Sequence, residues 1–315
     1  MSERRESTVV NSASAIILAG GEGSRLKTLT RAIAGDERPK QFCPILNNET
    51  LLDKTRERAA LGINPENTYF SLTEKHEIFY RSPLAAISED QLVIQPENKG
   101  TAPAILYSLL RIARTNPKAK VAFFPSDHYF SDDVAFMDHV EKAFDVVEMN
   151  SDSIVLLGIE PEKAETSYGW IEPVQSLFGG LSKAVSRVKC FWEKPEFSTA
   201  QKLMKEGALW NSFVMVGAVE TFLGFFEKHL PELYWLFDDA SVTFGTAAEE
   251  RSINSLYKLI GEINFSSEVL EKVSEELLVM RVGEVGWSDW GEPQRVLGTL
   301  SNLGVKPEWI HAVAA

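Results

Sequence analysis

Short apolar runs alternate with segments of helical periodicity over the first half of the chain, and this alternation limits the fold more than any other feature. Strands are expected over 15–18, 68–72, 91–95, 121–124 and 154–159, and helices over 51–60, 104–113 and 133–148. Strands that alternate with helices pair mostly in parallel, because each helix carries the chain back along the sheet. The sequence therefore predicts an α/β fold, with a mostly parallel mixed sheet and helices on both faces.

The pattern changes after about residue 160. Longer, more exposed strands are expected over 169–174 and 184–193, and further strands over 213–216 and 277–282. Ser198 is the expected cap of a helix over 199–206, which Gly207 ends. Residues 220–276 are expected to be mainly helical, with a closing helix over 292–300. Since no repeat or linker divides the chain, we expect one domain over 13–315 after a loose tail over 1–12.

The first expected strand enters a glycine-rich turn that is suited to binding phosphate. Gly20, Gly21 and Gly23 are followed by Ser24 and Arg25, and Lys40 comes soon after. Glycines let backbone N–H groups approach an anion closely, and the two cations can neutralise its charge. The segment from 25 to 40 holds five basic and two acidic residues, a local charge of +3 in a chain whose net charge is −13. The segment is therefore a candidate phosphate site.

Two commoner glycine loops are excluded. A P-loop needs a Gly-Lys-Ser/Thr ending, and no such lysine follows these glycines. The dinucleotide fingerprint needs a third glycine where Leu26 stands. For the glycines alone, an ordinary strand-to-helix turn is an equally good interpretation. Arg25 and the run Pro39-Lys40-Gln41-Phe42 favour the phosphate site.

Further polar groups follow other expected strands, where ligands bind in open parallel sheets. Asp127 comes directly after 121–124, and the segment from Gln95 to Thr101, which includes Asn98, follows 91–95. A carboxylate in this place can hold a divalent cation, because Mg²⁺ prefers one or two carboxylates together with phosphate oxygens. The alternative for Asp127 is a cap on the next turn, which is the commoner role of a lone aspartate there.

Three groups in the second half are also candidates. Glu193 can accept hydrogen bonds from hydroxyls while Lys194 meets a phosphate, although an isolated Glu-Lys pair is more often a solvated surface pair. Asn211 has an amide in an aromatic setting that suits sugar hydroxyls. Asp289 lies between two tryptophans and could complete a metal site with Asp127, which the sequence alone cannot test.

The overall composition excludes several classes of protein. A content of 44% apolar and 24% charged residues is ordinary for a globular chain with a sizeable core. No apolar run reaches the length of a membrane helix, and the polar start lacks a signal sequence, so we expect a cytoplasmic protein without a membrane partner. Two cysteines make no disulfide framework. The acidic balance argues against nucleic-acid binding.

Eight motifs, in order, resemble those of the sugar-1-phosphate nucleotidyltransferase family, and most closely its mannose-1-phosphate guanylyltransferases. The matching residues are 18–26, Pro39–Phe42, 101–104, 125–128, 158–161 with 165–170, Glu193–Pro195, Trp210–Ser212 and Trp287–Asp289. The resemblance implies a Rossmann-like domain, with a nucleotide-binding half over about 13–160 and a sugar-phosphate half over about 161–315. It also implies transfer of a nucleotidyl group, such as GMP from GTP, to a sugar-1-phosphate, with Mg²⁺ and release of pyrophosphate. It leaves a homodimer possible.

The resemblance also implies roles for individual residues. The expected catalytic residues are Arg25, Lys40 and Asp127. The expected nucleotide-binding residues are Gly20, Gly21, Gly23, Ser24, Gln95, Asn98 and Thr101. The expected sugar-phosphate ligands are Gly169, Glu193, Lys194 and Asn211, and the expected metal ligands are Asp127 and Asp289.

The chain departs from the family pattern at several positions, which include Lys99-Gly100, Phe213 and Trp290. These departures leave three interpretations open: the guanylyltransferase, an enzyme for another hexose-1-phosphate or nucleotide, and a non-catalytic regulatory homologue that binds nucleotide sugars.

Overall fold

Four parallel strands form the first half of the sheet. The computed structural model describes residues 13–46, 48–174, 184–307, 309 and 310, so the tail expected over 1–12 lies outside the described residues. Strands β1 (Ala13–Leu18), β2 (Thr68–Thr73), β3 (Leu92–Gln95) and β4 (Lys120–Pro125) lie in the order β3-β2-β1-β4. Their pairings are all parallel, as the alternating sequence pattern predicts. The carboxyl ends of these four strands consequently meet at one edge of the sheet.

The second half departs from the mostly parallel sheet that we expected. It contains β5 (Ile154–Ile159), β6 (Gly169–Pro173), β7 (Val185–Glu193), β8 (Leu209–Ala218) and β9 (Leu277–Val282). Only β5 and β9 pair in parallel here, and the other pairings between these described strands are antiparallel. Because β6 pairs with both β7 and β8, the strands β8-β5-β9-β7-β6 close into a ring of five. The α/β class and the mixed sheet are confirmed, but the sheet is not mostly parallel, because antiparallel pairs join β4 to β8 and most of the second half.

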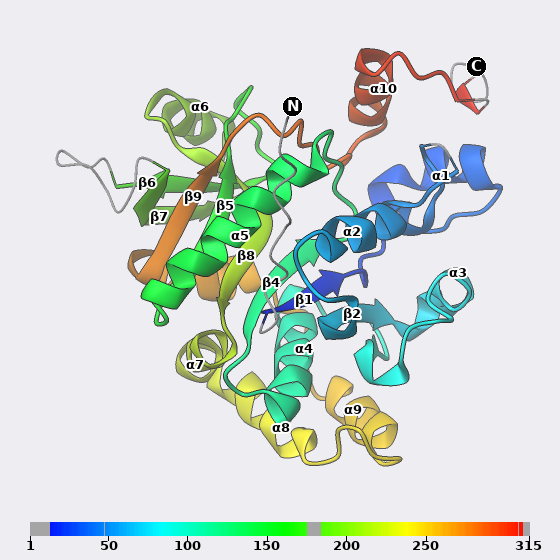
Figure 1. The fold of residues 1–315 in the computed structure, drawn as a ribbon, viewed down its shortest axis with the longest axis vertical. Helices are drawn as coiled ribbons and strands as arrows, with labels where there is room; N and C mark the ends of the chain where they lie inside the picture. The colour runs from blue at the N-terminus through cyan, green and yellow to red at the C-terminus, as the bar shows by residue number, and fades with distance from the viewer. Residues whose placement is uncertain (1–12, 47, 175–183, 308, 311–315) are drawn as a thin grey trace, which may run out of the picture.

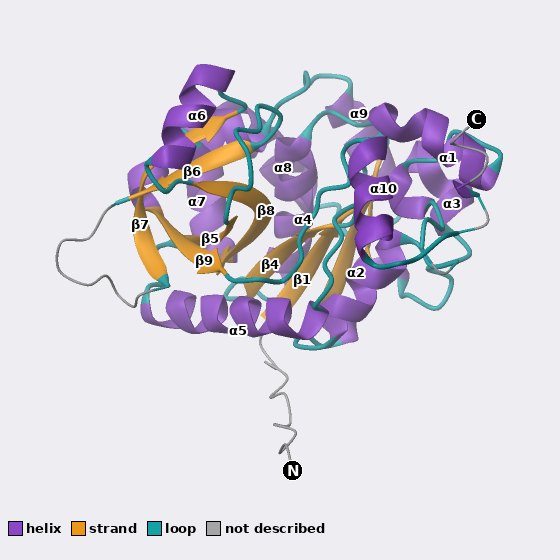
Figure 2. Ribbon diagram, turned by 90° about the horizontal axis from the view of Figure 1, so that it is seen from above, coloured by secondary structure: helices purple, strands orange, loops and turns teal. Residues whose placement is uncertain are grey.

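Helices cover both faces of the sheet. One face carries α2 (Leu51–Ala60) and α5 (Asp133–Met149), and the other carries α4 (Thr101–Thr115), α7 (Val219–His229), α8 (Pro231–Ser241) and α9 (Glu249–Tyr257) (Figures 1 and 2). Smaller helices are α3 (Glu77–Tyr80) and α6 (Phe197–Lys205), and α6 packs on β6.

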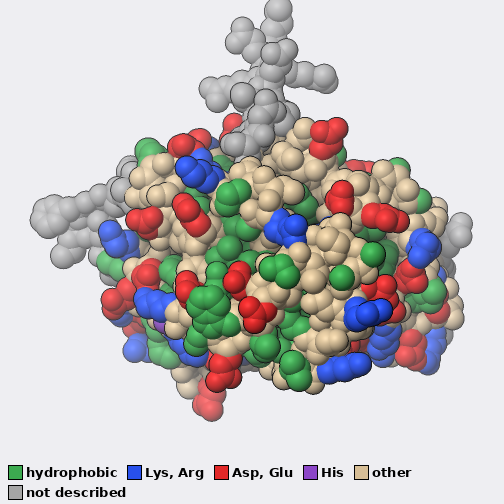
Figure 3. All heavy atoms as spheres, turned by 90° about the horizontal axis from the view of Figure 1, so that it is seen from below, with side chains coloured by type: hydrophobic (Ala, Val, Ile, Leu, Met, Phe, Trp, Pro, Cys, Tyr) green, Lys and Arg blue, Asp and Glu red, His purple; other side chains and the backbone are tan. Residues whose placement is uncertain are grey.

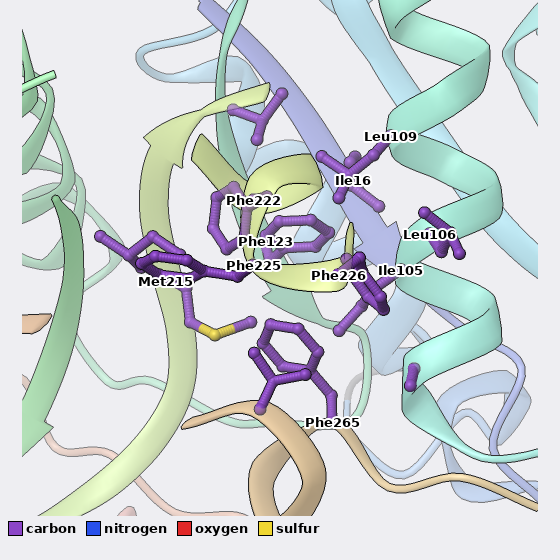
Figure 4. Packing of buried hydrophobic residues seen from close by; sticks show 14 of the residues in the cluster. Ile16, Ile105, Leu106, Leu109, Phe123, Met215, Phe222, Phe225, Phe226 and Phe265 are labelled. Carbon is purple, nitrogen blue, oxygen red and sulfur yellow. The ribbon is translucent and has the colours of Figure 1, made fainter. Parts of the chain in front are cut away.

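Alternate residues of the central strands belong to two separate hydrophobic cores. In β4, Val121 and Phe123 belong to the core beneath α4 and α7, while Ala122 and Phe124 belong to the core beneath α2 and α5. This follows from the two-residue period of a strand that is covered on both faces. Figure 4 shows Phe222, Phe225 and Phe226 of α7 packed around Phe123, with helix α4 on the other side of Ile16.

A third, smaller core joins the glycine-rich turn to the C-terminal helix. Leu26 and Leu29, at the start of α1 (Lys27–Ala34), pack with Trp290 and with residues of α10 (Pro293–Asn302). Residues 289–302 are therefore anchored beside the turn, although they lie more than 260 positions away in the sequence. This contact places Asp289, which precedes Trp290, near the glycine-rich turn.

Local predictions held for most elements and failed at two. Helix α6 begins at Phe197, and its N-cap is Glu196 without a side-chain hydrogen bond, so the prediction of Ser198 as the cap is wrong. Strand β8 runs from Leu209, so Asn211 lies inside a strand rather than before one.

Among the described residues, no helix is long and apolar enough to cross a membrane. Figure 3 shows the molecule from below the view of Figure 1, and on this face acidic and basic side chains are interspersed.

Candidate functional site

One cavity gathers most of the candidate residues. It measures about 430 Å³ and lies beyond the carboxyl ends of β1 to β4, where β7, β8 and the segment after β9 form the opposite wall. The candidates that line it are Gly20, Gly21, Arg25, Gln95, Asn98, Thr101, Asp127, Gly169, Glu193, Lys194, Asn211 and Asp289. A larger cavity of about 850 Å³, between α3, β3, α4 and α9, is lined by none of them.

The glycine-rich turn is held from behind. A Cβ at Gly20 would lie 2.9 Å from Thr73 Oγ1 and 3.1 Å from the amide nitrogen of Gln95, so no larger residue fits. Gln41 donates from Nε2 to the carbonyls of Ala19 (3.0 Å) and Gly21 (2.8 Å). These bonds fix two carbonyls of the turn, and Gly20 and Gly21 line the cavity. Gln41 belongs to the run Pro39–Phe42 that favoured the phosphate site, but its contacts to these carbonyls could not be predicted from the sequence.

Two members of the turn lie outside the cavity lining. Gly23 has a φ of +59°, and a Cβ there would lie 3.0 Å from the backbone nitrogen of Lys40, so its glycine is required by the turn itself. Ser24 begins a short 3-10 turn and is exposed. Arg25 is exposed at the cavity edge and pairs with no group among the described residues. Of the basic residues expected here, Arg25 is the one in position to meet a phosphate.

Lys40 does not line the cavity. Its side chain is buried behind the wall, where Nζ donates to the carbonyls of Asp289 and Trp290 and lies 3.3 Å from Asp127 Oδ2. In this structure the Lys40 ammonium thus contacts Asp127 and the 289–290 backbone, and its expected part in neutralising phosphate stays a prediction.

Asp127 and Asp289 both line the cavity, and the pKa of each carboxyl is lowered. Burial would raise the pKa of Asp127, but the charges of Lys40 and then His128 outweigh it and lower that pKa. Burial also acts to raise the pKa of Asp289. The hydrogen bond from Tyr168 and the charge of Lys40 lower it to about 2. Asp289 Oδ1 accepts from Tyr168 Oη (2.6 Å), from Arg295 Nη1 (2.5 Å) and from the backbone of Gly291 (3.0 Å).

These two carboxylates have the donor chemistry of candidate magnesium ligands. Among the described residues, no cluster of three or more His, Cys, Asp or Glu side chains could hold a metal by itself. Mg²⁺ needs only one or two carboxylates when phosphate oxygens and water supply the other ligands. Asp289 Oδ2 accepts no hydrogen bond within the described residues, and Asp127 is partly exposed to the cavity. One oxygen from each side chain is therefore available.

The opposite wall is built around Gly169. A Cβ there would lie 2.9 Å from Phe191 and 3.3 Å from Glu193 Oε2, so glycine keeps this wall open. Glu193 is nearly buried, and its Oε1 lies 3.1 Å from Lys194 Nζ and accepts from Asn264 Nδ2 at 3.4 Å. Asn211 uses its Oδ1 to accept from the backbone of Phe213 (3.0 Å), which leaves the Nδ2 group as a donor toward the cavity.

Phe213 lies at an irregularity in β8. Its φ is +59°, a left-handed conformation that is uncommon for a bulky residue, and the β5–β8 register shifts opposite it between Leu156 and Gly158. Ser212 fixes the irregularity by donating to the Leu157 carbonyl at 2.6 Å. Phe213 is consequently turned so that it lines the cavity beside Asn211.

The segment from Gln95 to Thr101, which is expected to contact the base, is held against the second half of the chain. The Gly100 Cβ position would lie 2.4 Å from the Ile263 carbonyl, and Thr101 Oγ1 accepts from the Phe265 backbone at 2.8 Å. Gln95 bonds to Ser71 (3.1 Å) with one end of its amide and to Tyr257 (3.1 Å) with the other. These bonds hold the Gln95 side chain in place at the cavity lining, and its expected part in nucleotide binding stays a prediction. Asn98 accepts from Gly100 at 2.9 Å and shapes the turn.

The comparisons with known proteins agree with this arrangement. The family model described as nucleotidyl transferase matches residues 14–302. The chain belongs to the nucleotidyl transferase family. The match covers both walls of the cavity, from the glycine-rich turn to Asp289 and α10.

Individual relatives are moderately similar. Mannose-1-phosphate guanylyltransferase 2 of Escherichia coli O157:H7 is 29% identical over 289 residues, which are 89% of this chain and 58% of that protein. The alginate biosynthesis protein AlgA of Pseudomonas syringae pv. tomato is 29% identical over 282 residues, 88% of this chain and 56% of that one. Among solved structures, the mannose-1-phosphate geranyltransferase of Thermus thermophilus is 28% identical with a TM-score of 0.77, and the match covers 91% of this chain and 79% of that one. The chain thus spans little more than half the length of the two sequence relatives.

Proposed function

We propose that this chain transfers a nucleotidyl group from a nucleoside triphosphate to a sugar-1-phosphate, releasing pyrophosphate. The observation that carries the proposal is the single cavity in which a phosphate-binding turn with Arg25 and two aspartates faces a wall of Gly169, Glu193 and Asn211. One wall suits a triphosphate and the other suits the hydroxyls of a sugar.

The reaction needs no covalent protein residue. A phosphate oxygen of the sugar-1-phosphate attacks the α-phosphorus in line, the bond from that phosphorus to the β-phosphate oxygen breaks, and pyrophosphate leaves. The chain's part is to hold both substrates and to stabilise charge. The turn's N–H groups and Arg25 would bind the triphosphate, while Lys194 and Asn211 would orient the sugar phosphate. Mg²⁺ held by Asp127 and Asp289, when bound, would neutralise charge on the phosphates.

GTP and mannose-1-phosphate are the substrates we propose. The support is the mannose-1-phosphate guanylyltransferase of Escherichia coli among the relatives, together with the eight motifs of the sequence. Lys99-Gly100 in the base segment and Phe213 in the sugar wall are the positions at which this chain would differ from that choice.

The test is pyrophosphate release across a grid of nucleoside triphosphates and sugar-1-phosphates. GTP with mannose-1-phosphate should give the highest kcat/KM, and chelation of divalent cations should abolish it. Release with a different nucleoside triphosphate or sugar-1-phosphate would change the proposed substrates but keep the proposed reaction. Release of pyrophosphate without any sugar-1-phosphate, or none with any pair, would contradict nucleotidyl transfer to a sugar phosphate.

A further inference from the structure

Arg295 is a nearly buried cation that bridges the two walls of the cavity. It lies in the first turn of α10, with 13% of its side chain exposed. Nη1 donates to Asp289 Oδ1 at 2.5 Å and to the hydroxyl of Tyr168, and Nη2 donates to Glu165 Oε2 at 2.5 Å. Its guanidinium carbon lies 4.8 Å from the centre of the Tyr168 ring. One side chain therefore holds three residues of two separate segments.

Burial of an arginine here costs free energy unless its guanidinium donors are aligned with acceptors. Burying a guanidinium removes it from water, and the carboxylates of Asp289 and Glu165 compensate only when both are aligned with its fork of donors. A lysine could reach one of these carboxylates but could not span both. The arrangement is therefore specific for arginine.

The two segments that Arg295 joins belong to opposite sides of the cavity. Glu165 lies four residues before Gly169, and Ser167, Tyr168 and Gly169 line the sugar side. Asp289 lies on the phosphate side. The Tyr168 ring, which the guanidinium covers, also contacts Trp210 (5.1 Å between ring centres) and Trp287 (5.4 Å). The position of this aromatic group thus depends on the same arginine.

We propose that Arg295 is a positioning residue that sets the separation of the two walls, by fixing residues 165–169 against Asp289. The proposal rests on the proposed function for its kinetic arm. It assigns Arg295 no contact with either substrate, because Arg295 and Glu165 do not line the cavity. We expect its effect mainly on the sugar side, since Gln41, which Arg295 does not contact, holds the carbonyls of the glycine-rich turn.

The kinetic test compares Arg295→Met with Glu165→Gln, which breaks the same bridge from the other end. Both variants should raise KM for the sugar-1-phosphate and lower kcat, together by roughly 10- to 100-fold in kcat/KM, because a misplaced wall costs orientation. The dissociation constant of the nucleotide, measured without sugar phosphate, should change by less than about threefold. Arg295→Lys should restore only part of the loss. Arg281→Met is the matched control, because Arg281 pairs with Glu160 at a half-exposed site outside the cavity lining.

A second readout needs no substrate. Near-ultraviolet circular dichroism reports the packing of Tyr168 against Trp210 and Trp287, and its signal should change in Arg295→Met and Glu165→Gln but not in Arg281→Met. A lower melting temperature with unchanged sugar KM and an unchanged aromatic signal would overturn the proposal and leave Arg295 a merely structural residue. If the wild-type protein releases no pyrophosphate, the proposed function fails, and the aromatic signal alone then decides for or against the positioning role.

Discussion

The ammonium group of Lys40 lies 3.3 Å from the carboxylate of Asp127, behind the wall of the cavity rather than inside it. The same group donates to the carbonyls of Asp289 and Trp290. Lys40 follows the glycine-rich turn, Asp127 lies two residues after β4, and residues 289–290 come from the C-terminal part of the chain. One buried cation therefore ties together the three segments that form the phosphate side of the cavity.

Lys40→Met should lower stability and activity together. Removing the ammonium takes the donor from the carbonyls of Asp289 and Trp290 and leaves the Asp127 carboxylate with only His128 beside it among the described residues. The free energy of unfolding should fall by about 2–3 kcal/mol, less than for a fully buried pair because Asp127 is partly exposed. Denaturant unfolding measures this change. Lys27→Met is the control, since Lys27 lies 3.6 Å from Glu37 with both side chains over 40% exposed, and it should change stability by less than about 0.5 kcal/mol.

Arg25→Ala should reduce turnover without reducing stability. Arg25 is exposed and pairs with no described residue, so its removal disturbs no contact of the fold. If it stabilises charge on the phosphates, kcat should fall by roughly 10²-fold or more, as when one preorganised donor is lost. Arg31→Ala, on the exposed surface of α1, should keep wild-type turnover. Wild-type kcat in a folded Arg25→Ala protein would remove Arg25 from the site.

Phe213→Gly and Phe213→Ala separate backbone strain from side-chain bulk. Both remove the ring from the cavity wall, but only glycine relieves the φ of +59°. The glycine variant should therefore be more stable than the alanine variant by about 1 kcal/mol. Both should change the rank order of accepted sugar-1-phosphates while keeping their need for a divalent cation. A stability loss with the wild-type rank order in both variants would show that Phe213 serves only the core against which it packs.

Many single helices and strands were predictable from the sequence, because their patterns lie within short segments. Strand β5 and helix α2 have the predicted bounds, since the apolar run of the strand and the helical spacing of the helix lie within their own residues. The five-strand ring was not predicted. It forms because β6 pairs with both β7 and β8, and the residues of β6 alone do not determine which strands it pairs with. The helix start at Phe197 likewise depends on where the preceding strand ends, which the serine at 198 does not determine.

The candidate site shows the same division. The types of residue at the strand ends identified the cavity, as for Asp127 and the glycine-rich turn. The direction of a side chain was not accessible, because Lys40 is turned away by carbonyls about 250 positions further along the chain. Arg295 carried no signal at all, since a single arginine on an amphipathic helix resembles any solvated residue until its buried partners are known.

Removal of divalent cations should abolish turnover, and the two aspartates should share this dependence. Asp127→Asn and Asp289→Asn each remove one anionic oxygen, so the Mg²⁺ concentration for half-maximal rate should rise by at least about 10-fold. The readout is initial rate against Mg²⁺ concentration at saturating substrates. Asp90→Asn is the control, because that side chain is 89% exposed and lies away from this cavity. A normal Mg²⁺ requirement in both aspartate variants would exclude the pair as metal ligands.

The fate of the sugar phosphate oxygens tests the central claim most directly. Mannose-1-phosphate labelled with ¹⁸O in its three non-bridging phosphate oxygens would be incubated with unlabelled GTP and Mg²⁺, and the products analysed by mass spectrometry. Attack by the sugar phosphate on the α-phosphorus predicts that all three labels appear in the nucleotide sugar and none in pyrophosphate. Label in pyrophosphate, or GMP formed in place of a nucleotide sugar, would contradict the transfer that this cavity is proposed to perform.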